Sequence, residues 1–137
     1  MKDYIAQTAQ FSILNAAVER ANFNIDGEGP YTFFAPNNDA WEALMTNNGW
    51  ASINDASPAV LNTILKFQFS DVGAYNADQF TNNFQITIQF QSKKVYIDLS
   101  DPSNPRVVAG LTSVGIVGSE YSATNGVIHE IDGVLLF

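Results

Sequence analysis

The residues that could do acid–base or metal chemistry in this 137-residue chain are almost all carboxylates, because it has one histidine and no cysteine. The histidine, His129, stands between Ile128 and Glu130 in an apolar run typical of a strand. A Ser–His–Asp triad would have to use His129, and a zinc site would need carboxylates as its other ligands. No nucleophile-elbow or phosphate-loop motif accompanies it. We therefore expect a structural histidine, bonded to backbone or carboxylate, and we predict no catalytic residues and no enzyme activity.

A second group with possible chemistry is a set of oxygen-bearing side chains, Asp98, Asp101 and Asn104, spaced three residues apart. Calcium prefers such ligands, but the segment lacks the glycine and the final glutamate of a helix–loop–helix calcium site. Aspartate and asparagine also favour turns in solvated loops. The sequence therefore favours a plain loop here, and we predict no metal and no cofactor.

Four aromatic residues are the candidates for a binding surface. Trp50 lies in an amide-rich segment and could stack on a sugar ring, but burial is favoured because Ile53 follows it by three residues. Tyr75, Tyr96 and Tyr121 are expected to be more exposed, either as interface anchors or as half-buried strand residues. We predict that any binding surface lies near these four positions.

The composition limits the class of partner. At 46% hydrophobic residues the chain can bury a core, which excludes a disordered segment. It carries 14 acidic and 6 basic residues, a net charge of −8, spread evenly along the chain. Such a surface repels phosphate backbones and anionic lipids, so we predict no nucleic-acid partner. The abundance of asparagine and glutamine suits recognition by hydrogen bonding.

The hydropathy pattern contains neither a membrane span nor a signal peptide. The longest uncharged apolar-leaning segment, residues 107–119, is too short to cross a bilayer and contains glycines. The first residues lack the apolar run of an export signal. We expect no direct insertion into a membrane, and if the parent protein is exported, this chain is a mature or excised piece of it.

Apolar periodicity predicts helices first and strands later. Helical spacing is found around 4–8, 12–21, 37–48 and 58–66. Ser12 is expected to cap the helix at 12–21, Asn37 or Asn38 the helix at 37–48, and Ser57 before Pro58 the helix at 58–66. Val60 is expected on the buried face of this last helix. Period-two alternation, with an Asn125-Gly126 turn signal, predicts strands at 84–91, 95–99, 106–109, 114–117 and 127–136, after an early strand at 31–35. This order predicts a single α+β domain over residues 1–137.

Two segments of the chain resemble the signatures of the fasciclin (FAS1) domain family. The first is Thr32-Phe33-Phe34-Ala35-Pro36-Asn37-Asn38-Asp39-Ala40-Trp41, and the second is Asn125-Gly126-Val127-Ile128-His129-Glu130-Ile131-Asp132-Gly133-Val134-Leu135-Leu136. The matching positions are Thr32, Phe34, Ala35, Pro36 and Asn37 in the first segment, and Asn125, Gly126, Ile128, His129, Ile131 and Asp132 in the second. The helix and strands between them also suit the family, so the resemblance covers essentially the whole chain.

The resemblance implies a wedge-like β-sandwich flanked by several helices, in which both signatures are structural. We expect the two segments to lie close together, with Asp132 satisfying polar groups around 37–39 and His129 hydrogen-bonded inside. The chain also departs from the family, because Phe67 and Gln68 stand where members commonly carry a Tyr-His pair. The integrin contacts associated with that pair in animal matrix relatives therefore do not carry over.

For function, the resemblance implies extracellular adhesion. We predict a non-catalytic module of a secreted or surface-anchored bacterial protein that binds a matrix protein, a cell-surface protein or a polysaccharide, or a second copy of itself. The alternative is a carrier that holds a small apolar ligand or pigment between helices and sheet, suggested by the many phenylalanines. An enzyme acting on polysaccharide or peptide would have only aspartate and glutamate to work with.

Overall fold

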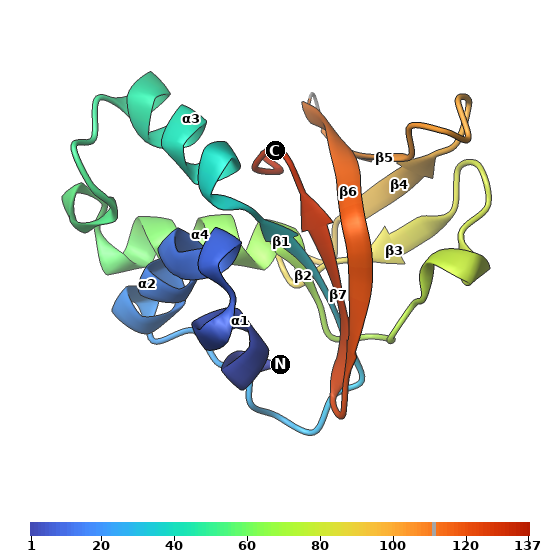
Figure 1. Cartoon of the computed structure of the whole chain (residues 1–137), viewed down its shortest axis with the longest axis horizontal. Helices are drawn as coiled ribbons and strands as arrows, with labels where there is room; N and C mark the ends of the chain where they lie inside the picture. Colours follow the sequence, from blue (N-terminus) through green and yellow to red (C-terminus); the bar gives the residue numbers. More distant parts are fainter. Residues whose placement is uncertain (111) are drawn as a thin grey trace.

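A computed structural model describes residues 1–110 and 112–137 and places the helices on one side of a strongly bent sheet (Figure 1). In this part of the chain the α-helices are α1 (Lys2–Gln7), α2 (Ser12–Ala21), α3 (Asn38–Asn48) and α4 (Pro58–Gln68). Short 3-10 helices are η1 (Ala9–Phe11), η2 (Ile53–Asp55) and η3 (Ala77–Gln79). The strands are β1 (Tyr31–Pro36), β2 (Phe69–Ser70), β3 (Gln85–Thr87), β4 (Lys94–Asp98), β5 (Arg106–Ala109), β6 (Thr112–Ala123) and β7 (Gly126–Ile131). The predicted α+β class is confirmed.

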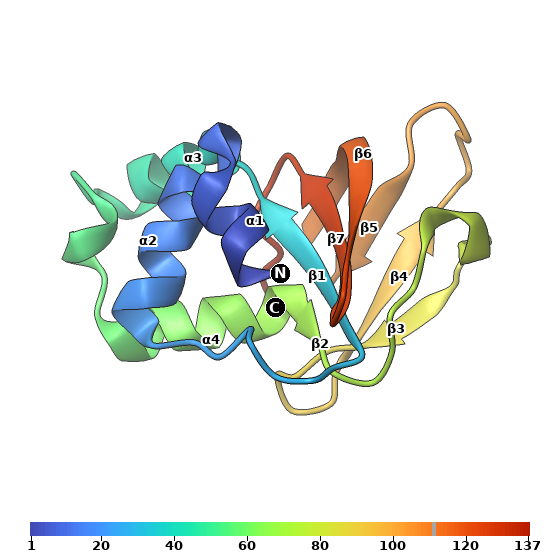
Figure 2. The ribbon, with the colours of Figure 1, turned by 60° about the horizontal axis from the view of Figure 1, so that its bottom comes forward.

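The sheet has the strand order β2-β1-β7-β6-β5-β4-β3 and folds back on itself until its two ends meet (Figure 2). β1 and β7 run parallel, whereas the other neighbouring pairs are antiparallel. At the closure, the Gln89 backbone N–H donates to the Phe69 carbonyl at 2.8 Å, and the Ser70 hydroxyl donates to the Thr87 carbonyl. These two bonds connect β2 with β3 and the residues just after it, so the two edges of the sheet partly cover each other.

The central strands β1 and β7 are buried on both faces. Phe33 and Ile128 face the helices, while Phe34 and Ile131 face the inside of the bent sheet. The cluster on the helix side includes Ile5, Phe11, Leu14, Val18, Phe33, Trp41, Leu61, Leu65, Phe69 and Ile128. The cluster inside the bent sheet includes Phe34, Phe67, Phe80, Ile86, Ile88, Val95, Ile97, Val107, Val114, Ile131 and Leu135. β1 and β7 separate the two clusters, so these strands position the side chains that face the helices and those that face the inside of the bent sheet.

The starts of α3 and α4 agree with the capping signals, whereas the expected Ser12 cap is wrong, because Ser12 is itself the first residue of α2 and its side chain makes no cap bond. The Asn37 Oδ1 accepts from the Ala40 backbone N–H at 3.0 Å, and the Ser57 hydroxyl oxygen accepts from the Val60 N–H at 3.2 Å, with Pro58 as the first helical residue. Both caps are therefore confirmed. The expected burial of the Val60 side chain is wrong: it is 44% exposed, because it lies in the first turn at the edge of the apolar stripe.

Two strands are shorter than the alternation predicts, and one is longer. The strand expected at 84–91 ends at Thr87, because the chain then leaves β4 to bond Phe69. The strand expected at 127–136 ends at Ile131, and the segment after it is held by side chains. The strand expected at 114–117 extends over the whole of β6, with a bulge between Val117 and Tyr121. The predicted β6–β7 hairpin is present, with its turn at 124–125.

Gly126 is required by the close approach of β1 to β7. A Cβ on Gly126 would overlap the backbone carbonyl of Tyr31, its partner in the parallel register. Since neither backbone can move without breaking the pair, we expect Gly126→Ala to lower the free energy of unfolding by about 3 kcal/mol, the upper range for overpacking. Urea denaturation measures this. The matched control is Gly49→Ala, which has open space but a positive φ of 70° and should cost about 1 kcal/mol. Equal costs at the two glycines would contradict the argument.

Within residues 1–110 and 112–137, none of the helices combines the length and the apolar character needed to cross a membrane.

Candidate functional site

The two signature segments lie side by side as the parallel pair β1–β7. In this register Thr32 is opposite Val127, Phe34 is opposite His129 and Pro36 is opposite Ile131. The expected proximity of the segments is therefore present. The motif positions are distributed along this pair and its ends, namely Thr32, Phe34, Ala35, Pro36, Asn37, Asn125, Gly126, Ile128, His129, Ile131 and Asp132.

The residue that joins the two segments through its side chain is Glu130, and the expectation for Asp132 is wrong. The Asn37 backbone N–H donates to the Ile131 carbonyl at 3.1 Å, and the Asn37 Nδ2 donates to the Glu130 carboxylate at 3.0 Å. Asp132 instead accepts from the Gly115 N–H at 2.7 Å. The reason is positional: Asp132 follows the end of β7 and turns toward the antiparallel neighbour β6, away from β1.

The other end of the pair is fixed by Asn125. Its Nδ2 donates to the carbonyls of Ile25 and Gly27, both at 3.0 Å. The Tyr31 N–H donates to the Asn125 carbonyl at 2.9 Å. Asn125 thereby attaches the loop between α2 and β1 to the β6–β7 turn. This contact gives the motif position a structural role.

His129 is buried inside the bent sheet, with 1% of its surface exposed. Its Nε2 lies 2.7 Å from the Tyr75 carbonyl oxygen and donates to it, as the expected interior hydrogen bond requires. The ring stacks near Phe34 and Phe80, with centroids 5.6 and 5.0 Å away. Burial lowers the pKa of His129, opposed by the hydrogen bond to Tyr75 and by the charge of Glu120. The imidazole is therefore enclosed among aromatic rings and held by a backbone hydrogen bond, as expected of a structural histidine.

The buried neutral His129 predicts a loss of stability on mild acidification. In the unfolded chain its pKa is near the ordinary value of 6.5, and in the folded protein it is lower. Above 6.5 both states are neutral; as the pH falls below it, the unfolded chain takes up a proton that the folded protein resists, so the free energy of unfolding decreases. Urea denaturation from about pH 7.5 to about pH 5.5 should show this slope. His129→Gln should remove it, and a slope that persists in the variant would contradict the assignment.

The loop from Asp98 to Asn104 satisfies its own carboxylates. Asp98 accepts from the backbone N–H and hydroxyl of Ser100, at 3.0 and 2.8 Å. Asp101 accepts from the Ser103 hydroxyl at 2.7 Å and from the Asn104 amide at 3.0 Å. These hydrogen bonds lower the pKa of both aspartates. Within the described part of the chain, no three histidine, aspartate or glutamate side chains gather as a metal site.

This loop geometry predicts that the protein does not depend on calcium. Because donors of the loop already bond Asp98 Oδ1 and both oxygens of Asp101, a cation that bridged the two aspartates would have to displace some of these bonds. Thermal melts in excess calcium and in EDTA should have midpoints that agree within about 1 °C, since a ligand that does not bind the folded state does not shift its stability. A clearly higher midpoint in calcium, reversed by EDTA, would contradict this.

The four aromatic candidates do not form one surface. Trp50, which follows α3, and Tyr75 are half-buried against the helix-side and sheet-side clusters respectively. Tyr96 on β4 and Tyr121 on β6 are 41% and 40% exposed. α3 and β4 lie at opposite ends of the molecule in Figure 1, so a common site is geometrically impossible. Of the four, Tyr121 lines a pocket that also includes residues of the N-terminal helices.

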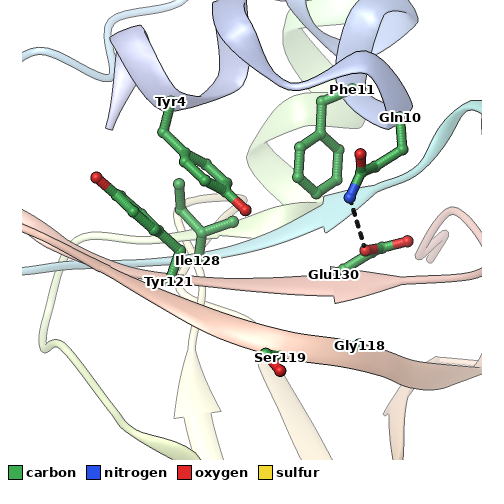
Figure 3. A pocket seen from close by; sticks show the side chains of 8 residues that line it. All are labelled: Tyr4, Gln10, Phe11, Gly118, Ser119, Tyr121, Ile128 and Glu130. Carbon is green, nitrogen blue, oxygen red and sulfur yellow. Dashed lines mark hydrogen bonds between the residues drawn. The ribbon is translucent and has the colours of Figure 1, made fainter.

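That pocket lies between the N-terminal helices and the β6–β7 hairpin (Figure 3). It has a volume of about 240 Å³ and is lined by Tyr4, Gln10, Phe11, Gly118, Ser119, Tyr121, Ile128 and Glu130. Tyr4 from α1 stacks on Tyr121 from β6, with ring centroids 3.7 Å apart and planes 11° from parallel. At the other end, the Gln10 amide donates to Glu130 at 3.5 Å. We call this space the α1–β6 pocket.

The α1–β6 pocket combines an apolar floor with one negative charge. Phe11 and Ile128 are buried below its opening, at 1% and 2% exposure. Glu130 is half-buried, and among residues 1–110 and 112–137 its two oxygens accept from the Asn37 and Gln10 amides alone. Sequence reasoning missed Tyr4, Gln10 and Glu130. The alternation along β7 places Glu130 on the same face as Ile128, but nothing in the pattern shows that Gln10, 120 residues away, lies opposite it.

The fold is that of a FAS1 domain. A solved FAS1 domain pair from the insect cell adhesion molecule Fasciclin I superposes with a TM-score of 0.63 over 98% of this chain and 43% of that chain, at 20% sequence identity. The family assignment comes from the sequence: the Fasciclin domain model matches residues 9–137. The chain therefore belongs to the fasciclin domain family.

Relatives of this chain come from animals and from a cyanobacterium. Human Stabilin-1 is 25% identical over 134 residues, which are 96% of this chain and 5% of the relative. Pig transforming growth factor-beta-induced protein ig-h3 is 25% identical over 117 residues, 85% of this chain and 16% of the relative. Protein sll1483 of Synechocystis sp. is 31% identical over 131 residues, 92% of this chain and 67% of the relative. The chain thus spans only a small part of these two animal relatives.

Proposed function

We propose that residues 1–137 form one non-catalytic adhesion domain that binds a protein outside the cell, as part of a secreted or surface-anchored bacterial protein. The observation that carries this is membership of the fasciclin family together with the fold of a FAS1 pair from a cell adhesion molecule. The likeness to the cyanobacterial protein supports a bacterial parent. The acidic surface supports a protein partner over a nucleic acid.

The site geometry supports binding over chemistry. The only histidine is enclosed among aromatic rings, and its Nε2 is committed to the Tyr75 carbonyl. The α1–β6 pocket, at about 240 Å³, is below the volume of sites that enclose drug-sized ligands, so it does not favour the pigment-carrier alternative. A pocket of this size suits one side chain of a protein partner.

Bead adhesion tests this proposal. Beads coated with the purified domain would be applied to immobilised extracellular proteins and, separately, mixed with one another to detect homophilic contact. We expect retention on a limited set of proteins, above the level of beads coated with an unrelated acidic domain of similar size. Retention equal to that control on every surface, with no bead aggregation, would overturn the adhesion function.

The outer face of β4 favours a second candidate function, recognition of an acidic polysaccharide. Tyr96 is exposed there, with Gln85 directly opposite on β3, and Lys93 and Lys94 line the same hollow of about 440 Å³. An exposed ring can stack on a sugar, and lysines attract carboxylate or sulfate groups even in a molecule of charge −8. A glycan array probed with the wild type and with Tyr96→Ala tests this. Loss of acidic-glycan binding in the variant is expected, and no binding by the wild type would remove this candidate.

A further inference from the structure

Glu130 in the α1–β6 pocket is a half-buried carboxylate without a positive partner. Among residues 1–110 and 112–137 the ion pair present is Lys2–Asp26, at 3.5 Å, and it does not involve Glu130. One Glu130 oxygen accepts from Asn37 at 3.0 Å, whereas the other accepts only from Gln10, at the 3.5 Å limit of a hydrogen bond. Since a carboxylate offers about four acceptor sites, this second oxygen has capacity left for a strong donor.

The backbone leaves the approach to that oxygen open. Gly118, in the bulge of β6, has a φ of 68°, and a Cβ on it would lie 3.2 Å from the same Glu130 oxygen that meets Gln10. A glycine at this point therefore keeps free the space beside the carboxylate. Bulges of this kind commonly redirect a strand next to a binding site.

The other residues that line the pocket determine which kind of ligand could place a hydrogen-bond donor beside Glu130. The floor of Phe11 and Ile128 and the wall made by the Tyr4–Tyr121 stack are apolar, and Glu130 stands at the opposite end (Figure 3). An alkyl chain that ends in an ammonium group matches this arrangement, because its stem packs on apolar surface while its three N–H donors reach acceptors. The Glu130 carboxylate and the Tyr4 hydroxyl are both acceptors in this lining.

We propose that the α1–β6 pocket receives the side chain of a lysine from a partner protein, with its ammonium group on Glu130. The choice of a protein as the source rests on the proposed adhesion function and on the volume of about 240 Å³, which suits one side chain. The charge of the occupant follows independently of that function, because an anionic group would be repelled by Glu130 and by a molecule of net charge −8, whereas a cation is attracted to both.

The test is an NMR titration of the 137-residue protein with a blocked Gly-Lys-Gly peptide. The comparison ligands are the same peptide with its lysine Nε acetylated, a Gly-Arg-Gly peptide and n-butylammonium. We expect saturable shifts of the Tyr4 and Tyr121 ring signals with the lysine peptide and loss of these shifts on acetylation, which keeps the stem and removes the charge. This comparison uses the wild-type protein, so it does not depend on the folding of any variant.

Two matched variants test whether the lysine peptide is bound by the Glu130 carboxylate or by the acidic surface in general. Glu130→Gln retains an acceptor for Asn37 and should weaken lysine-peptide binding at least about tenfold, because it removes a charge-assisted hydrogen bond. Glu42→Gln, an equal charge change at an exposed site on α3, should change the affinity less than about twofold. Equal effects of the two variants would show general attraction by the acidic surface and overturn the site.

The remaining outcomes also decide the proposal. Equal binding of the acetylated peptide, or no change in Glu130→Gln, overturns the role of Glu130. Tighter binding of the arginine peptide overturns lysine as the occupant, and binding of n-butylammonium without the peptide overturns a protein source. If the protein binds the lysine peptide but beads coated with it adhere to no surface, the lysine site stands and the adhesion function is rejected. Failure of the site and failure of the proposed function are therefore distinguishable.

Discussion

Phe69→Ala should lower the free energy of unfolding by about 3–5 kcal/mol, the range for truncating a buried phenylalanine. Phe69 is completely buried where β2 meets the helix-side cluster. Its ring lies against Phe23, Tyr31 and Phe33, with centroids 5.3, 4.8 and 5.2 Å away, two of them edge-to-face. Truncation therefore removes these aromatic pairs as well as leaving a cavity. Urea denaturation followed by tryptophan fluorescence measures the change.

The control for this prediction is Phe137→Ala, the same truncation at a side chain that is 42% exposed and touches Phe67 at one edge. It should cost less than about 1 kcal/mol, because 42% of its surface already meets water, whereas Phe69 has none exposed. If Phe69→Ala cost no more than Phe137→Ala, the cluster of four rings around Phe69 would not be a main source of stability.

Gln68→Ala should be comparably destabilising, by about 3–5 kcal/mol, although it removes a polar side chain. Gln68 is completely buried at the end of α4. Its Nε2 donates to the carbonyls of Ile64 and Leu135 at 2.9 and 2.8 Å, and its Oε1 accepts from the Leu135 N–H at 2.9 Å. The variant leaves both backbone groups of buried Leu135 unpaired, and each such group costs about 1–3 kcal/mol.

Hydrogen exchange provides a second readout for Gln68. The Leu135 amide should exchange much faster in Gln68→Ala, because the side chain that protects it is gone. Gln79→Ala is the matched control, since the Gln79 side chain bonds only an exposed amide, that of Asn76, and its loss should cost less than about 1 kcal/mol. An unchanged exchange rate at Leu135 would show that Gln68 does not hold the chain after β7.

Local signals predicted the parts of the fold that depend on neighbouring residues. The Asn37 and Ser57 caps need only residues three positions away, and both form as predicted. Alternation from 95 to 99 predicts β4 to within a residue at each end. The length of β3 was not predictable, because it is set by the bond between Gln89 and Phe69 on a distant strand.

The candidate site was less predictable than the fold for the same reason. Tyr121 could be selected as an exposed aromatic, but the partner that stacks on it, Tyr4, is on the first helix. The prediction assigned to Asp132 the contact with Asn37 that Glu130 makes, since the direction of each side chain depends on where β7 ends. Gln68 stood out only as a departure from the family pattern, and its function follows from a contact 67 residues away.

The measurement that tests adhesion most directly is binding of the purified domain to an array of extracellular proteins and polysaccharides, performed in calcium and again in EDTA. We predict selective binding to a few members of the array, with the same selectivity in both conditions, because the Asp98 and Asp101 carboxylates are hydrogen-bonded within their own loop and a bound cation would have to displace part of these bonds. Binding no greater than that of an unrelated acidic domain, across the whole array and in both conditions, would contradict the proposed function.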